Sequence, residues 1–104
     1  MSKIVRFTET AGLDLETIGD WIALDNPNRA ALFVREISKK CMQLATMSER
    51  FVRVDGHTDV RKRVHGNYVI FYRASDKAVH ILHIFHGSTN IDDSDFHSTE
   101  FGES

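Results

Sequence analysis

The 104-residue chain has 41% hydrophobic and 27% charged residues and a formal net charge of −2 at pH 7. A chain of this length forms one domain with a single core, and the composition excludes disordered and fibrous classes. No apolar run approaches the roughly 18 residues of a membrane span. The start, MSKIVRF, lacks the apolar core of a signal peptide, and one cysteine, Cys41, cannot form an internal disulfide. A reducing, cytoplasmic location is therefore expected.

Charge is unevenly distributed along the chain. Residues 92–104 contain five acids and no Lys or Arg, which leaves a net charge of +3 on residues 1–91. Between Arg50 and Arg73 there are six basic and two acidic residues. Such a patch favours an acidic partner, either nucleic acid or an acidic protein segment. Charge along a strand edge is the alternative explanation, because it prevents aggregation.

The first half of the chain predicts a strand followed by two helices. KIVRF, residues 3–7, is a short β-branched run typical of a strand. Thr8 is suited to cap a helix, and apolar residues at helical spacing follow from Ala11 to Ile22. Asn26 and Pro27 end this helix and begin a second one, which ends near Met47. Cys41 occupies a core position of that second helix.

The second half predicts an antiparallel sheet. Residues 48–60 are ambiguous, because FVRV reads as either a strand or an ordered loop. VRKRVHGNYVIFYR then gives two strands joined by a Gly66-Asn67 hairpin turn, and AVHILHIF gives another. The fold class is therefore α+β with two layers: an N-terminal strand, an antiparallel helical hairpin, then three or four antiparallel strands.

Three histidines, His80, His83 and His86, recur at intervals of three in VHILHIFHGST. Imidazoles at this spacing could bind a transition metal if the segment were helical. The β-branched residues around them predict a strand instead, on which side chains alternate between faces. His80 and His86 are then expected on one face and His83 on the other, so no metal site is predicted.

Alternation also sorts the rest of the sheet. Pairing around the hairpin turn puts Arg61, Arg63, Tyr68, Ile70 and Tyr72 on one face, which Ile81, His83 and Phe85 join if the register continues. Two helices can cover only one face of such a sheet. The face flanked by Arg61 and Arg63 is predicted to be the open one, forming a docking groove for another chain. Self-association is the alternative way of closing it.

The order of these segments resembles a known family. FTETAGLDLETIGDWIALDNPNRAALFVREISKKCMQLA, a basic strand, YVIFYR and ILHIFHG are together similar to ParE toxins of the RelE/ParE superfamily, over residues 3–91. The most specific features are DNP after W-I-A, the IFYR strand, and the terminal HG before a short polar stretch. The resemblance implies the toxin of a bacterial type II toxin–antitoxin module, which inhibits DNA gyrase rather than cutting a substrate itself.

The resemblance also implies the partners. A ParD-like antitoxin would neutralise the toxin in a hetero-oligomer, and promoter DNA would be contacted only through the antitoxin; no cofactor and no membrane partner are expected. Antitoxin tails are typically acidic and amphipathic, which fits an apolar face with a basic rim. The predicted antitoxin-binding residues are Arg61, Arg63, Tyr68, Ile70, Tyr72, Ile81, His83 and Phe85.

The domain would end at residue 91, leaving residues 92–104 as an acidic, flexible tail. In the alternative interpretation, the acids and Phe96 or Phe101 fold back on the basic face and compete with antitoxin or target.

A RelE-like ribonuclease that cleaves messenger RNA on the ribosome is the alternative function. Its chemistry needs cations for the developing phosphorane charge and groups that transfer protons. The candidates are Arg61, Arg63 and Arg73 for the first role, and His83 or His86 for the second. Where RelE-like enzymes tend to carry a catalytic arginine, or relatives a histidine, this chain has Thr89. The nuclease set is therefore incomplete, and no catalytic residue is assigned under the first interpretation.

Overall fold

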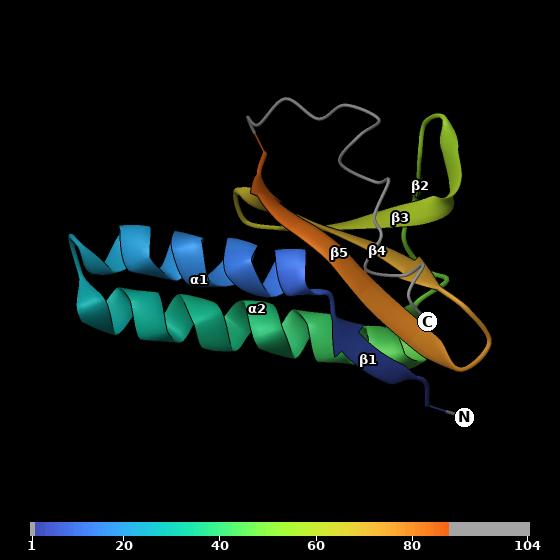
Figure 1. The fold of residues 1–104 in the computed structure, drawn as a ribbon, viewed down its shortest axis with the longest axis horizontal. Helices are drawn as coiled ribbons and strands as arrows, with labels where there is room; N and C mark the ends of the chain where they lie inside the picture. The colour runs from blue at the N-terminus through green and yellow to red at the C-terminus, as the bar shows by residue number, and fades with distance from the viewer. Residues whose placement is uncertain (1, 88–104) are drawn as a thin grey trace.

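The structure, a computed structural model, describes residues 2–87 except for the side chains of His57 and Thr58, and shows a helical hairpin against one five-stranded sheet (Figure 1). The elements in chain order are β1 Ile4–Phe7, α1 Glu9–Ala23, α2 Pro27–Met47, β2 Arg53–Val54, β3 His57–His65, β4 Tyr68–Ala74 and β5 Ala78–His86. The predicted α+β class and element order are confirmed. The ambiguous segment contributes the short β2 and the start of β3.

Both helices begin at the caps expected from the sequence. Thr8 Oγ1 accepts a hydrogen bond from the amide of Ala11 at 3.1 Å, and Asn26 Oδ1 accepts one from Arg29 at 3.1 Å. Pro27 holds the first position of α2, where a missing amide hydrogen costs nothing. The Thr8 hydroxyl also donates to the carbonyl of Ile81 at 2.8 Å, which fastens the start of α1 to β5.

The sheet has the strand order β1-β5-β4-β3-β2, in which β1 runs parallel to β5 and the other neighbours are antiparallel. Gly66, with a φ of +60°, makes the turn between β3 and β4 in a conformation that favours glycine. The predicted hairpin register is confirmed, since Arg61 pairs with Tyr72 and Arg63 with Ile70.

The helices pack on one face of the sheet and form the main core with it. Nine side chains that are 0–1% exposed meet there: Ala11, Ile37, Cys41, Leu44, Ile70, Tyr72, Val79, Ile81 and Ile84. Burial of each large aliphatic side chain contributes roughly 1.5–3 kcal/mol. This helix-covered face carries Tyr72 and Ile70, so the prediction that it is open is wrong. Both faces have apolar centres, and side-chain alternation alone does not say which one the helices cover.

A β-bulge in β5 explains a second difference. Phe71 pairs with His83 and the next residue, Tyr72, pairs with Ile81, which leaves Leu82 as an extra residue. The bulge puts His83 on the same face as His80, whereas His86 pairs with Tyr68 on the helix-covered face. The predicted grouping of His80 with His86 is wrong because the sequence does not reveal the bulge. Among residues 2–87, no three His, Cys, Asp or Glu side chains are grouped to hold a metal ion.

The HG motif at the end of β5 has a packing role. The amide of Gly87 donates to the carbonyl of Asn67 at 2.6 Å, and a Cβ on Gly87 would lie 3.2 Å from that same oxygen. Glycine therefore allows the end of β5 to approach the β3–β4 turn. Neither helix of the described part is long and apolar enough to cross a bilayer.

Candidate functional site on the outer face of the sheet

The eight predicted antitoxin-binding residues do not form one surface. Ile70, Tyr72 and Ile81 are each 0% exposed beneath the helices. Arg61, Arg63 and Tyr68 lie on the same helix-covered face, by their pairing with buried neighbours. Only His83 and Phe85 lie on the opposite face, which is called the outer face below. Whether any of the eight contacts an antitoxin stays a prediction, but the eight residues do not share the one open sheet face that was predicted.

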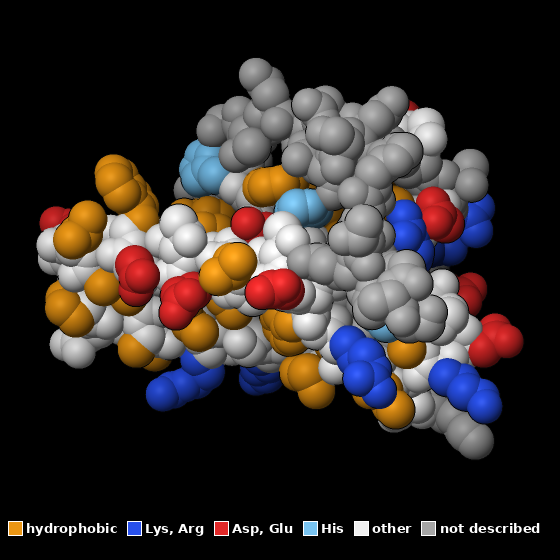
Figure 2. All heavy atoms as spheres, viewed as in Figure 1, with side chains coloured by type: hydrophobic (Ala, Val, Ile, Leu, Met, Phe, Trp, Pro, Cys, Tyr) orange, Lys and Arg blue, Asp and Glu red, His pale blue; other side chains and the backbone are white. Residues whose placement is uncertain are grey.

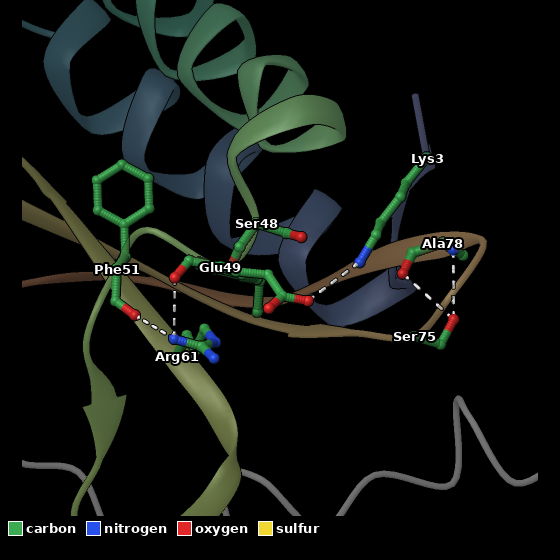
Figure 3. A network of polar contacts seen from close by, with 8 residues as sticks. Lys3, Ser48, Glu49, Phe51, Arg61, Ser75 and Ala78 are labelled. Carbon is green, nitrogen blue, oxygen red and sulfur yellow. Dashed lines mark hydrogen bonds and ion pairs between the residues drawn. The ribbon is translucent and has the colours of Figure 1, made fainter. Parts of the chain in front are cut away.

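Arg61 and Arg63 hold the loop after α2. Arg61 Nη1 donates to the carbonyls of Phe51 at 2.7 Å and Glu49 at 3.4 Å (Figure 3). Arg63 Nη1 donates to the carbonyl of Lys40 at 3.0 Å, and its guanidinium carbon lies 4.8 Å from the Phe51 ring centroid. Charged hydrogen bonds to backbone carbonyls and a cation–π contact both stabilise the fold. These two cations therefore have a structural role.

Tyr72 completes this anchoring. Its hydroxyl donates to the carbonyl of Ser48 at 2.6 Å, between β4 and the end of α2. Burial raises the pKa of Tyr72 from its ordinary 10.0 to about 12, although the positive charges of Arg61 and Arg63 oppose the rise. This contact could not be predicted, because the acceptor is a backbone carbonyl 24 residues away along the chain.

Replacing Tyr72 by phenylalanine tests this contact through pH. A tyrosine with a raised pKa adds stability that is present below the unfolded pKa near 10 and is lost as pH rises through about 12, because the unfolded state ionises first. The free energy of unfolding of the parent protein should therefore fall between pH 10 and 12, measured by urea denaturation. Tyr72→Phe should show a smaller fall and, at pH 7, a loss of about 1 kcal/mol. An equal fall in both proteins would contradict the assignment.

The outer face has an apolar centre made by strand residues. Val60, Phe71 and Leu82 are 0–3% exposed, and Val54, Val69 and Phe85 pack around them. The rings of Phe71 and Phe85 meet edge to face with centroids 5.9 Å apart. This outer cluster, defined by these six residues, contains no residue of α1 or α2. It is therefore a second hydrophobic cluster, distinct from the main core, with Val54, Val69 and Phe85 as its partly buried members.

A carboxylate orients the histidine at the edge of this cluster. β1 ends at Phe7, and α1 continues along the edge of β5, where Asp14 Oδ2 accepts from the amide of Ile84 at 3.0 Å. The same oxygen lies 3.2 Å from His83 Nδ1, and the carboxylate can only accept, so this bond places a proton on Nδ1. The imidazole also stacks on the Phe85 ring, with centroids 4.8 Å apart. His83 is thus fixed in position on the outer face.

Cations surround the outer cluster. Lys62 pairs with Phe71 and is exposed, and Arg6 and Arg73 both pair with His80 on the same face. Arg73 Nε lies 2.7 Å from Asp59 Oδ2. The five strands together hold six basic residues and one acid, whereas α1 holds four acids and no Lys or Arg. Figure 2 shows acidic side chains along the middle of the helical hairpin, and Lys and Arg both below the hairpin and toward the strands. Arg6, Lys62 and Arg73 therefore make the outer face basic, whereas Arg61 and Arg63 lie on the helix-covered face.

The candidate nuclease residues are not brought together. Arg61, Arg63 and His86 lie on the helix-covered face, whereas Arg73 and His83 lie on the outer face. Two sets separated by a sheet cannot act on one phosphate. Thr89, the position at which relatives keep a cation, lies outside the described residues.

A hollow at the far end of the hairpin was not expected from the sequence. It has a volume of about 510 Å³ and lies between the α1–α2 turn and the β3–β4 turn, lined by Trp21, Ile22, Leu24, Asp25, Arg29, Phe33, Asn67 and Tyr68. Trp21 is 72% exposed, although its helical spacing predicts a buried residue. The hairpin extends beyond the sheet at this end, so among the described residues no strand covers the last turn of α1 (Figure 1).

A helical hairpin packed on one face of a sheet with this strand order defines the RelE/ParE-like class of toxin domains. The family described as "ParE toxin of type II toxin-antitoxin system, parDE" matches residues 5–91. The chain therefore belongs to the ParE toxin family, and the predicted resemblance is confirmed. It is the toxin of a type II toxin–antitoxin system.

Two solved structures share the fold. One, from the chromosomal ParDE TA system of P. aeruginosa, has a TM-score of 0.70 and 22% identity, and the match covers 82% of this chain and 96% of that one. The other, from the toxin–antitoxin complex RelBE2 of Mycobacterium tuberculosis, has a TM-score of 0.62 and 24% identity, covering 83% and 99%. A comparison with curated protein sequences gave no match.

Proposed function

We propose that this toxin inhibits DNA gyrase and is neutralised by a ParD-like antitoxin whose acidic, amphipathic C-terminal segment docks on the outer face. The observation that carries the docking site is a hydrophobic cluster built from strand residues and flanked by Lys62 and Arg73 on the face opposite the main core. Both structural relatives come from toxin–antitoxin systems, which supports an antitoxin partner. The family membership supports gyrase as the target.

The proposed docking site replaces most of the predicted one. His83 and Phe85 are retained from the predicted set, and Lys62, Val69, Phe71 and Leu82 are added from the outer face. Apolar side chains of the partner would pack on the partly buried Val69 and Phe85, next to the buried Phe71 and Leu82. Its carboxylates would meet Lys62 and Arg73, so long-range attraction would speed association and make it sensitive to salt.

A ribosome-dependent ribonuclease remains the second candidate, and one observation favours it. An imidazole held by a carboxylate, as His83 is by Asp14, is a common arrangement for proton transfer. The cations on the outer face, Lys62 and Arg73, would have to replace Arg61 and Arg63 as the phosphate-binding groups. Gyrase inhibition needs no catalytic set, so the separation of Arg61, Arg63 and His86 from Arg73 and His83 counts only against the ribonuclease.

Two assays on the same purified full-length chain separate these functions. We expect inhibition of gyrase supercoiling and accumulation of broken DNA, with no cleavage of messenger RNA on translating ribosomes. The product of the adjacent reading frame, added in equal amount, should restore supercoiling. Ribosome-dependent cleavage without gyrase inhibition would overturn the proposal. A His83→Ala variant serves as a control, since it should abolish cleavage if the ribonuclease interpretation is correct.

A further inference from the structure

We propose that residues 92–104 of this chain bind the outer face and compete there with the antitoxin segment. The competition rests on the proposed function, whereas the contact within the chain does not. The tail would then act as an internal inhibitor of antitoxin binding.

The first argument is the burial of the outer cluster. Val60, Phe71 and Leu82 are 0%, 3% and 2% exposed, and the partly buried hydrophobic residues packed against them, Val54, Val69 and Phe85, come from the sheet itself. Neighbours on the same face shield the flanks of a strand residue, whose outer end points away from the sheet. Val54, Val69 and Phe85 are only partly buried, so a segment lying on this face would bury apolar area, and α1 and α2 pack on the other face.

The second argument is charge. Residues 92–104 contain five acids and no Lys or Arg. The outer face holds Arg6, Lys62 and Arg73, of which Lys62 is exposed beside Phe71 and Arg73 is paired with Asp59. The surface of α1, with its four acids, would repel the same tail. α2, with four basic residues and the single acid Glu36, is also basic, so charge argues against α1, whereas the apolar cluster is what favours the outer face over α2.

The third argument is the chemistry and reach of the tail. Phe96 and Phe101 are the aromatic residues in DDSDFHSTEFGES, and each is flanked by acids, as in a segment that binds an apolar surface with a basic rim. β5 ends at His86 and neighbours β4, which neighbours β3. Strands lie about 4.8 Å apart, and an extended chain advances about 3.3 Å per residue. Ten residues from His86 to Phe96 are thus ample to reach Phe71 and Val60.

Attachment makes even a weak contact effective. A segment joined by a short linker experiences a local concentration on the order of millimolar. A tail whose dissociation constant is near that local concentration occupies the outer face for a large part of the time. The apparent dissociation constant of a competitor then rises as the fraction of unoccupied outer faces falls. Removing the contact should therefore tighten antitoxin binding about threefold to tenfold.

A spin label tests the contact without an antitoxin. Ser98→Cys in the full chain would carry the nitroxide, because burial raises the pKa of Cys41 to about 12 and leaves its thiol unreactive. We expect strong broadening of the methyl signals of Val60, Val69 and Leu82. Leu15 and Val34 on the helix side should stay sharp. Equal broadening on both sides, or none on the outer face, would overturn the proposal.

Mixing two kinds of labelled chain shows whether the outer face is covered by the tail of the same chain or by a second copy. Isotope-labelled chains without the nitroxide are mixed with nitroxide-bearing chains that carry no isotope, so only contacts between copies cause broadening. Absence of broadening in the mixture supports the tail of the same chain. Broadening of equal strength in the mixture would mean that a second copy covers the outer face, and would overturn the intramolecular assignment.

Competition is tested with Phe96→Ser and Phe101→Ser together in the full chain, with Ser94→Ala as the matched control in the same segment. The double variant should lose the outer-face broadening and bind the antitoxin about threefold to tenfold more tightly, while Ser94→Ala changes neither. Unchanged affinity after loss of the broadening would overturn the competition. Failure of both proteins to bind the antitoxin would count against the proposed function, whereas the spin-label result would still decide the contact.

Discussion

Replacing Ile81 by alanine should lower the free energy of unfolding by about 2–5 kcal/mol, because the truncation leaves a cavity where β5 meets the helices. Ile81 is 0% exposed and belongs to the main core with Ile37 and Leu44. It is also one of the residues that the sequence assigned to an open docking face. The change is measured by urea denaturation followed by circular dichroism, with the variant's spectrum checked against that of the parent.

Val64→Ala is the matched control for this prediction. Val64 lies on a strand like Ile81 but is 63% exposed and points to the outer face. Its truncation should change the free energy of unfolding by about 0.5 kcal/mol or less. Similar small losses in both variants would mean that the helices do not cover Ile81, and would restore the face assignment made from the sequence.

Local signals in the sequence were sufficient to predict the helices and strands and the pairing of part of the sheet. Thr8 and Asn26 cap helices because short polar side chains satisfy free amides whatever the tertiary structure. The Gly66-Asn67 turn determined the register of β3 and β4, since a two-residue hairpin leaves no choice of pairing. These features depend on neighbours within a few residues, and for that reason they could be predicted.

Features that depend on distant contacts could not be predicted. Ile70 and Phe71 are adjacent and both apolar, and only the packing of Ile37 and Leu44 decides that Ile70 faces the helices. The extra residue at Leu82 follows no glycine or other local signal, yet it moves His83 to the other face. Because the period of a strand is two, one unpredicted residue reverses every assignment after it.

A count of basic residues in the sequence does not show which of their side chains bind other groups in the fold. Arg61 and Arg63 raised the basic charge of the predicted site, but their guanidinium groups bind carbonyls of α2 and of the loop after it. Lys62, between them, points to the outer face and is exposed. Alternation therefore divides one basic run into structural and accessible charges, and the accessible one is the better candidate for a partner.

Because Arg63 and Lys62 lie on opposite faces of the sheet, we expect replacement of Arg63 to lower stability and replacement of Lys62 to lower antitoxin affinity. Arg63→Met should lower the free energy of unfolding by about 1–3 kcal/mol, because the bond to the Lys40 carbonyl and the contact with Phe51 are lost. Its antitoxin affinity should stay within about twofold, since the folded outer face is unchanged.

Lys62→Glu should do the opposite. Stability should change by about 0.5 kcal/mol or less because the side chain is exposed, whereas antitoxin affinity should fall about tenfold or more, mainly through slower association that depends on salt. Lys39→Glu on the exposed surface of α2 makes the same charge change away from the proposed site and should have a much smaller effect. Urea denaturation and biolayer interferometry measure the two quantities. If Arg63→Met weakened binding while Lys62→Glu did not, the antitoxin would have to dock beside the α2 loop, because only there is the Arg63 guanidinium within reach of a partner.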